Sequence, residues 1–428
     1  MRLVIFPLSL VAMVGAAPIP AQDGSVLIHN ARVFDGTRML GVRDVLVENG
    51  RISAIGKRLT ASAGLETVDA KGRTLMPGLI DGHVHVFPGA QSDALRFGVT
   101  TVFDMYSAAD QQTVNRWRVQ RTSNLAVSEA DTYTAGVGAT PPGGHPMELF
   151  TDTSPDVAKP VTLAPDDDAT AFMKARVSSG SDYIKVLQDD GTRPGQPGSL
   201  PTFSSQRFAL VLQAAKATGK RVVVHVQQLK DARVAVANGT DALEHAICDA
   251  PVDDALIAAM KAGGIVQTAT LATYAGLAGT NDAHLLAAEP AVSPYLTQRQ
   301  RGMLGLVWRH PRPNDFAIAS ANVGRLARAG VRIVAGTDAP NPTTAFGPSL
   351  HLELKLLVRA GLTPTQALVA ATSAPAGFFG TTDRGRLAPG LKADMLLIDG
   401  DPTKDITATQ RIVKIWKNGH VINRSPPS

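Results

Sequence analysis

Residues 74–85 read Thr-Leu-Met-Pro-Gly-Leu-Ile-Asp-Gly-His-Val-His, an apolar run that ends in two histidines two positions apart. Side chains alternate faces along a strand, so His83 and His85 project the same way and their imidazoles can converge on one metal ion. Taken alone, the pair fits two exposed histidines on an edge strand equally well. The stretch predicts a strand whose C-terminal end carries a candidate metal site.

Four further polar residues repeat this pattern, each at the C-terminal end of a short β-rich run: Lys185, His225, His245 and Asp338. The apolar runs alternate with amphipathic stretches such as 205–216 and 229–238, which is typical of βα units and a parallel sheet. Eight strands can be placed, and they end near His85, Met105, Tyr133, Leu187, Val226, Ala246, Leu271 and Asp338. The chain length suits a TIM barrel of about 250 residues with additions, and the active site of such a barrel lies where the strands end.

With these six residues in this order, and with the tail Gly-Arg-Leu-Ala-Pro-Gly-Leu-Lys-Ala-Asp at 385–394, the chain resembles the amidohydrolase superfamily. The resemblance is to its binuclear branch, which includes imidazolonepropionase-like proteins, prolidase-like carboxypeptidases and ochratoxin-type amidases. It extends from about Ser25 to Ile422. The fold class that we expect is therefore α/β, a (β/α)8 TIM barrel with a small composite β-sandwich formed by the two ends of the chain.

The ends of the chain carry the strand patterns that such a sandwich needs. Short alternating strands run from Ser25 to about Asp69, and Asn49-Gly50 and Asn418-Gly419 suit type I′ hairpin turns. A late helix is predicted to begin at Thr363, with Pro364 in its first turn and Gln366 closing a capping box. We expect a signal peptide at 1–21, the composite β-sandwich at 22–77 and 386–428, and the barrel at 78–385.

The resemblance also implies a pair of divalent metal ions, with zinc as the expected metal. His83, His85 and Asp338 are expected to bind the more buried ion, and His225 and His245 the second. In this family the lysine that matches Lys185 reacts with CO₂, and the resulting carbamate bridges both ions. An unmodified ammonium pointing into the barrel would be a costly buried charge. The alternative is an ion pair between Lys185 and Asp189 or Asp190.

Two residues are candidates for catalysis. Asp338 is expected to act as general base toward a hydroxide that bridges the metals, in addition to being a ligand. His145 lies in Pro-Pro-Gly-Gly-His-Pro (141–146) after the third strand, where related proteins carry a Gly-Gly-His that reaches the substrate carbonyl. A substrate-binding role and a plain loop role both stay open for His145. The acids Asp81 and Glu244 are predicted to lie on the opposite face from the ligands, as supporting or structural groups.

The remaining histidines and the cysteine are not predicted to take part. His351 is expected to be a helical surface residue, and His29, His284, His310 and His420 are expected to be structural or exposed. Cys248 is the single cysteine, so an internal disulfide is impossible, and three residues along a strand from His245 it would point to the other face.

Composition and motifs exclude several other classes of protein. The chain is globular, with 44% apolar and 18% charged residues, and its net charge of +5 is dispersed rather than clustered as in nucleic-acid binders. Gly136-Val-Gly138 lacks the third glycine of a dinucleotide site, and no Gly-x-Ser-x-Gly elbow occurs. Residues 1–21 have the layout of a secretory signal peptide, with cleavage expected after Ala21, so we expect an exported, periplasmic or secreted protein without a membrane span.

The sequence therefore predicts a metal-dependent hydrolase that cleaves an amide bond of a small molecule, such as an N-acyl amino acid or a peptide-like substrate. A lactonase or esterase of the same superfamily is the first alternative. A mononuclear deaminase and a non-catalytic relative are further ones. The loops 188–201 and 274–303 contain no motif that identifies the substrate, although Arg193 would favour an anionic ligand, and the number of subunits, including a homo-oligomer, stays open.

Overall fold

The structure is a computed structural model that describes residues 24–107, 109–149, 161–192 and 198–425. The predicted signal peptide and Arg193 lie outside these ranges. No helix in the described ranges is both long and apolar enough to span a membrane. The predicted α/β class is confirmed, because parallel strands alternate with helices through most of the chain.

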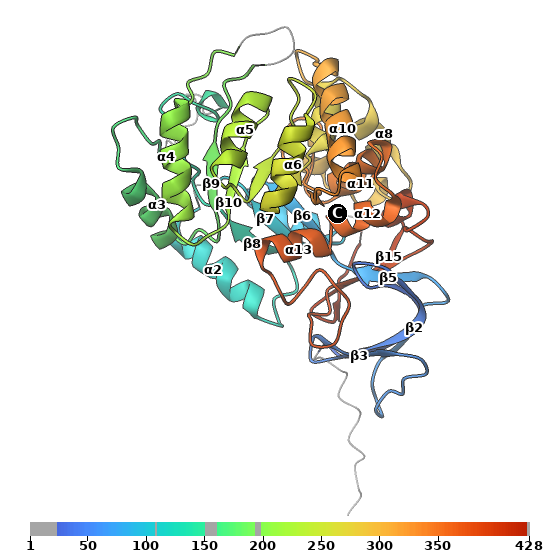
Figure 1. The fold of residues 1–428 in the computed structure, drawn as a ribbon. Helices are drawn as coiled ribbons and strands as arrows, with labels where there is room; N and C mark the ends of the chain where they lie inside the picture. The colour runs from blue at the N-terminus through green and yellow to red at the C-terminus, as the bar shows by residue number, and fades with distance from the viewer. Residues whose placement is uncertain (1–23, 108, 150–160, 193–197, 426–428) are drawn as a thin grey trace, which may run out of the picture.

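Eight short parallel strands form the centre of the molecule, in two sheets of order β6-β7-β8 and β13-β12-β11-β10-β9. Helices cover these strands, and Figure 1 shows α3 to α6 and α10 outside them. Strands covered on both faces consist mainly of buried residues rather than of an alternating pattern. Their bounds are β6 (Leu79–Val84), β7 (Val99–Asp104), β8 (Asp131–Thr134), β9 (Ile184–Leu187), β10 (Val222–His225), β11 (Ala242–Glu244), β12 (Val266–Thr268) and β13 (Ile333–Val334).

Hydrogen bonds join the two parallel sheets at both edges. On one side, Asp182 N donates to Thr134 O (2.7 Å), which links the start of β9 to β8. On the other, Gly82 N donates to Ala335 O (2.9 Å), which links β6 to the segment after β13. A Cβ on Gly82 would lie 2.3 Å from Val334 Cγ1, so only glycine allows this approach.

The predicted ends of the first six of these strands agree with the structure within two residues. The last two predictions are wrong. β12 ends at Thr268 rather than at Leu271, because Thr270 adopts a left-handed conformation (φ 51°) and Leu271 already begins a helix. β13 ends at Val334, four residues before Asp338, which lies in the following loop.

The helices of the described ranges pack around the strands or connect them. The predicted helix 205–216 is confirmed, the one at 229–238 ends at Ala237, and Thr363 and Gln366 form the predicted capping box. The bounds are α1 (Ala90–Leu95), α2 (Gln111–Thr122), η1 (Met147–Leu149), α3 (Ala169–Ser178), α4 (Ser205–Lys216), α5 (Leu229–Ala237), α6 (Asp254–Gly263), α7 (Leu271–Leu277), α8 (Asp282–Ala288), η2 (Ser293–Tyr295), α9 (Gln298–Leu304), α10 (Pro313–Arg328), α11 (Pro348–Arg359), α12 (Pro364–Ala370), α13 (Ser373–Phe379) and η3 (Ile406–Gln410).

The two ends of the chain pair with each other in one eight-stranded sheet, of order β16-β15-β14-β5-β1-β2-β3 with β4 beside β1. β5 and β14 pair antiparallel, so that Leu75 lies opposite Leu397. Both Asn-Gly turns have the two positive φ angles that a type I′ turn needs. The bounds are β1 (Val26–Phe34), β2 (Met39–Glu48), β3 (Arg51–Gly56), β4 (Thr67–Asp69), β5 (Thr74–Pro77), β14 (Met395–Ile398), β15 (Ile412–Lys417) and β16 (His420–Val421).

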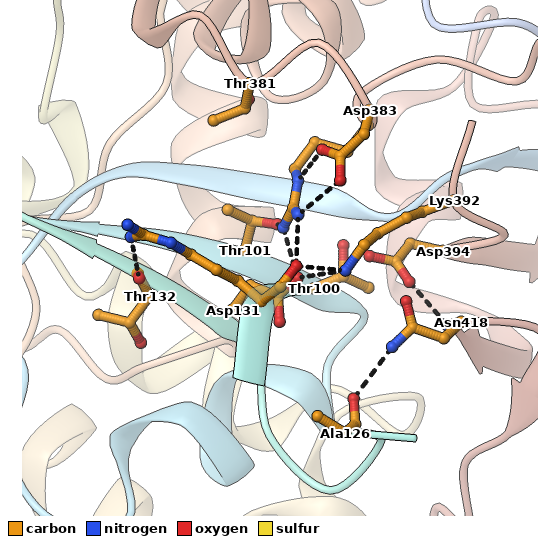
Figure 2. Close-up of polar contacts among 12 residues, drawn as sticks. Thr100, Thr101, Ala126, Asp131, Thr132, Thr381, Asp383, Lys392, Asp394 and Asn418 are labelled. Carbon is orange, nitrogen blue, oxygen red and sulfur yellow. Dashed lines mark hydrogen bonds and ion pairs between the residues drawn. The ribbon is translucent and has the colours of Figure 1, made fainter. Parts of the chain in front are cut away.

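A buried charge cluster connects this terminal sheet to β8 (Figure 2). Asp131, the first residue of β8, contacts Arg384, Lys392 (3.4 Å) and Lys417 (2.9 Å), and Lys417 also contacts Asp394 (2.9 Å). Burial acts to raise the pKa of Asp131, but the three cations outweigh it and hold the pKa below its usual value. The carboxylate therefore neutralises cations that come from segments far away in the sequence.

Removing this carboxylate is expected to destabilise the protein strongly. In Asp131→Ala the three cations would stay buried without their shared partner, and breaking a buried ion pair costs about 3–5 kcal/mol. Urea unfolding measures the change. Asp254→Ala is the control, since its side chain is 94% exposed in an ion pair with Arg325 and should matter little. A similar, small change for both variants would contradict the prediction.

Candidate metal centre

Three of the predicted ligands lie close enough to share one metal ion. One ligand atom each from His83, His85 and Asp338 lies within 4.8 Å of the other two. Asp338 Oδ1 is 3.1 Å from His85 Nε2 and 3.4 Å from His83 Nε2. A hydrogen bond from Asp338 N to His83 O (2.8 Å) holds the loop after β13 against β6. The set offers two imidazole nitrogens and a carboxylate oxygen, which suits zinc and similar ions.

His225 and His245, which are also buried, extend this group. The His245 ring centroid lies 4.5 Å from that of His83 and 4.2 Å from that of His225. His245 Nδ1 is 3.9 Å from Asp338 Oδ2. The four predicted histidine ligands and Asp338 therefore form one continuous cluster at the C-terminal ends of the parallel strands, where such folds place their active sites.

A buried carboxylate fixes the orientation of His83. Glu244 Oε2 lies 2.7 Å from His83 Nδ1, and Thr268 Oγ1 donates to Glu244 Oε1 (3.1 Å). His83 Nε2 is buried and has no hydrogen-bond partner among the described residues, so it is the nitrogen left for a metal. The prediction that Glu244 supports the ligands agrees with this contact, but its placement on the opposite face is wrong. Alternation along β11 ends at His245, which has a left-handed backbone (φ 70°).

His245 and His225 each have a polar partner at one ring nitrogen, as His83 does. Thr270 Oγ1 lies 3.0 Å from His245 Nδ1, which leaves Nε2 as the available nitrogen. Asp189 Oδ2 lies 3.2 Å from His225 Nε2, which leaves Nδ1. Partners that occupy one ring nitrogen and leave the other are the usual second layer of a metal site.

Lys185 lies near enough to this cluster to interact electrostatically with Glu244 and Asp338, but it has no ion-pair partner among the described residues. It is 2% exposed, and its Nζ makes no hydrogen bond within the described residues. The alternative pairing is wrong, because Asp189 contacts His225 and Asp190 contacts Lys230 (2.6 Å). Burial lowers the pKa of Lys185 to about 8, so more of the side chain is a neutral amine near neutral pH than for an ordinary lysine.

The buried histidines are held in the neutral form that binds metals. Burial lowers the pKa of His83 and His245 far below the usual value and that of His225 to about 3. The neutral imidazoles of His83, His225 and His245 and the carboxylate of Asp338 are donors that divalent metal ions bind, and the buried Nε2 of His83 makes no hydrogen bond among the described residues. The residues present therefore fit a metal centre.

Backbone strain is concentrated at this cluster. His245, Thr270 and Asp338 all have positive φ angles (70°, 51° and 56°), which cost roughly 1–3 kcal/mol each for residues other than glycine. Glu353 of α11 supports one of these turns, since its Oε2 accepts a hydrogen bond from Ala272 N (2.7 Å) in the first turn of α7. Strain that persists at a cluster of ligands indicates a functional site.

The loop after β8 brings His145 to the same cluster. Its ring centroid lies 4.5 Å from that of His225, and its Nδ1 lies 2.6 Å from Glu148 Oε1. The ring of His145 therefore lies beside a predicted metal ligand. A contact between His145 and a substrate stays a prediction.

Other residues singled out from the sequence lie elsewhere. His351 is buried rather than on a helix surface, and its ring nitrogens lie 3.0 Å from Phe97 O and from Thr409 Oγ1. Cys248 is buried, and its Sγ lies 3.6 Å from Oε1 of Gln227, a residue that in turn contacts His225. Asp81 accepts from Thr337 Oγ1 (2.7 Å), as expected of a supporting acid.

Sequence reasoning gave no role to Thr270, Glu148 or Glu353 and considered Asp189 only as a partner of Lys185. Thr270, Glu148 and Asp189 each contact a histidine of the site, and Glu353 contacts the adjoining turn at Ala272. All four belong to turns or to elements distant in the sequence. The spacing of Glu148 three residues after His145 was the one local signal available, because residues three apart meet on a helical turn.

Several known proteins resemble this chain in sequence or in fold. A sequence model of the amidohydrolase family matches residues 74–423. The imidazolonepropionase of Salinispora arenicola (strain CNS-205) is 27% identical over 403 residues, which cover 87% of this chain and 90% of that protein. The structure of molinate hydrolase matches with a TM-score of 0.74 at 22% identity, over 94% of this chain and 95% of that one. A Xaa-Pro dipeptidase with bound methionine in the active site matches with a TM-score of 0.72 at 21% identity, over 93% and 99%.

Proposed function

Because this chain belongs to the amidohydrolase family and is a hydrolase acting on carbon–nitrogen bonds, we propose that it cleaves the amide bond of an N-acyl amino acid or dipeptide-like substrate with two bound divalent metal ions. One observation carries the proposal. Four histidines, Asp338 and a buried unpartnered lysine converge at the C-terminal ends of the parallel strands.

His83, His85 and Asp338 would hold one ion, and His225 and His245 the other, with zinc as the expected metal. Ions bound there would supply an activated water and would polarise the substrate carbonyl. The histidine orientations set by Glu244, Thr270 and Asp189 support this division, because each leaves one ring nitrogen for a ligand bond.

Lys185 would complete the site as a carbamate. The neutral amine attacks the carbon of CO₂, an N–C bond forms as one C=O π bond opens onto oxygen, and one proton leaves the nitrogen. The side chain would then be an anion that can serve the bound metal ions as a ligand. The lowered pKa of Lys185, caused by burial, supports this reaction, since the nucleophile is the unprotonated amine. The change also removes the cost of an unpaired buried ammonium.

Asp338 would then carry one proton from the attacking water to the leaving amine. As water adds to the carbonyl carbon, an oxygen of Asp338 accepts its proton, and the same carboxyl later donates that proton to the amine nitrogen as the C–N bond breaks. The position of Asp338, within 3.4 Å of two histidine nitrogens and 7% exposed, keeps this transfer away from bulk water. The products are an acid and an amine.

The closed barrel and the composite β-sandwich are part of the same proposal. We infer that the two parallel sheets, bonded at both edges, form a closed (β/α)8 barrel at 78–385, and that the terminal sheet folds as a composite β-sandwich at 22–77 and 386–428. Export after removal of residues 1–21 is likewise proposed from the sequence.

The substrate class rests on one likeness and one electrostatic argument, and a second likeness favours another candidate. A Xaa-Pro dipeptidase shares the fold and was solved with bound methionine in its active site. Two metal ions make the pocket positive, which favours a substrate with a free carboxylate. The match to an imidazolonepropionase, over 87% of this chain and 90% of that protein, favours a second candidate, hydrolysis of a cyclic amide such as the substrate for which that relative is named.

A substrate panel separates these functions. Zinc-loaded enzyme is tested on N-acyl amino acids and dipeptides, on the same amides without the carboxylate, on cyclic amides and ureides, and on lactones, at one pH with Lys185→Ala as control. We expect the highest kcat/KM for the carboxylate-bearing amides. A preference for lactones or cyclic amides above about tenfold, equivalent to roughly 1.4 kcal/mol, would replace the proposed substrate class.

A further inference from the structure

Glu148 forms a close pair with His145 beside the ligand cluster. Its Oε1 lies 2.6 Å from His145 Nδ1, and the two side chains are 35% and 21% exposed. Burial acts to raise the pKa of Glu148, but the hydrogen bond and the charge of His145 outweigh it and place the pKa below its usual value. Glu148 is therefore an ionised acceptor, and the proton between the two groups belongs to Nδ1.

The loop that carries this pair has little freedom. Thr140 Oγ1 donates to His145 O (2.7 Å), and Gly144 N donates to Pro141 O (2.9 Å). A Cβ on Gly144 would lie 2.7 Å from Pro201 O, so only glycine fits where the loop meets this segment. The single turn of η1 then brings Glu148 back to His145.

The free nitrogen of His145 is left for another partner. Nε2 makes no hydrogen bond among the described residues, while the ring lies 4.5 Å from that of the ligand His225. A carboxylate that binds Nδ1–H keeps Nε2 available in both protonation states of the ring, as in other pairs of histidine and carboxylate.

We propose that Glu148 is a positioning residue, which holds His145 with Nδ1–H toward itself and Nε2 toward the substrate amide at the metal centre. The inference rests on the proposed amide hydrolysis and deepens it. Glu148 itself touches neither a ligand nor the reacting atoms, so it acts through His145.

The competing explanation is an ordinary surface ion pair. Exposed pairs three residues apart on a helical turn contribute little. Lys404 and Asp401 form such a pair (4.0 Å), with the lysine side chain 82% exposed, so Lys404→Ala is a matched control away from the centre.

A double-mutant cycle on the best amide of the panel tests whether Glu148 acts through His145. Glu148→Ala is expected to lower kcat about tenfold or more with a smaller change in KM, and to have less than about a twofold effect in the His145→Ala background. Lys404→Ala should stay within about twofold of the wild type. Wild-type kcat in Glu148→Ala, or an equal loss in both backgrounds, would overturn the proposal.

A second readout is independent of turnover. In zinc-loaded protein labelled with ¹⁵N-histidine, the His145 signals, assigned by their loss in His145→Ala, should show the proton on Nδ1. In Glu148→Ala they should move to the Nε2–H form or to a mixture of both forms. An unchanged His145 tautomer would overturn the positioning role. Absence of amide hydrolysis together with this tautomer change would instead reject the proposed function and retain the pair.

Discussion

Replacing Asp338 by asparagine is expected to lower kcat by about 10²- to 10⁴-fold while much of the metal stays bound. The amide oxygen can still face an ion, and its size preserves the packing against His83 and His85, which lie 3.4 and 3.1 Å from the carboxylate. An amide, however, does not accept the proton that the attacking water releases. The variant therefore separates proton transfer from ligand binding.

Elemental analysis and kcat measured on the same Asp338→Asn preparation decide this point. Urea unfolding serves as the control for folding. A kcat within about tenfold of the wild type at full metal content would contradict the role of general base. Asp254→Asn, which changes an acid with a 94% exposed side chain, should leave both metal content and kcat unchanged.

Replacing Lys185 is expected to affect the metals themselves. Wild-type protein expressed with Zn²⁺ and bicarbonate should contain close to two metal ions per chain, and Lys185→Ala should contain about one or fewer and lose nearly all turnover. The reason is that the lysine carbamate would be an anionic ligand of the metal ions. Burial already lowers the pKa of Lys185 to about 8, which favours the neutral amine from which the carbamate forms. Added formate or acetate, which can enter the space of the missing side chain, should restore part of the activity.

Lys392→Ala is the matched control for this prediction. Lys392 is also a buried lysine, but it is paired with Asp131 at the junction with the terminal sheet. Its loss should lower stability and leave the metal content at two. Two metal ions per chain in Lys185→Ala would contradict the bridging role. A wild-type content of one metal ion per chain that bicarbonate does not raise would contradict it as well.

Much of this arrangement could be predicted from local sequence. His83 lies near the end of β6 and His85 just after it, His225 ends β10, and His245 follows β11. Convergence therefore followed from the geometry of parallel strands. The helix from 205 to 216 and the turns at Asn49-Gly50 and Asn418-Gly419 matched because the residues that decide them are adjacent. The ordinary propensities of these segments agree with the fold.

Two of the wrong predictions concern residues beside points where the backbone departs from regular strand geometry. Left-handed residues end β11 at His245 and turn the chain at Thr270, and periodicity does not reveal such points. Glu244 was therefore assigned to the opposite face, and the seventh strand was extended to Leu271. The prediction that His351 lies on a helix surface was wrong for a different reason, because its partners Phe97 and Thr409 are far away in the sequence.

The central claim, two ions joined by a modified Lys185, is tested most directly by crystallography at the zinc absorption edge on protein grown with Zn²⁺ and bicarbonate. We predict two anomalous peaks, one among His83, His85 and Asp338 and one beside His225 and His245, with carboxylate density extending from Lys185 Nζ between them. A single peak, or none, together with an unmodified Lys185 amine would contradict the account.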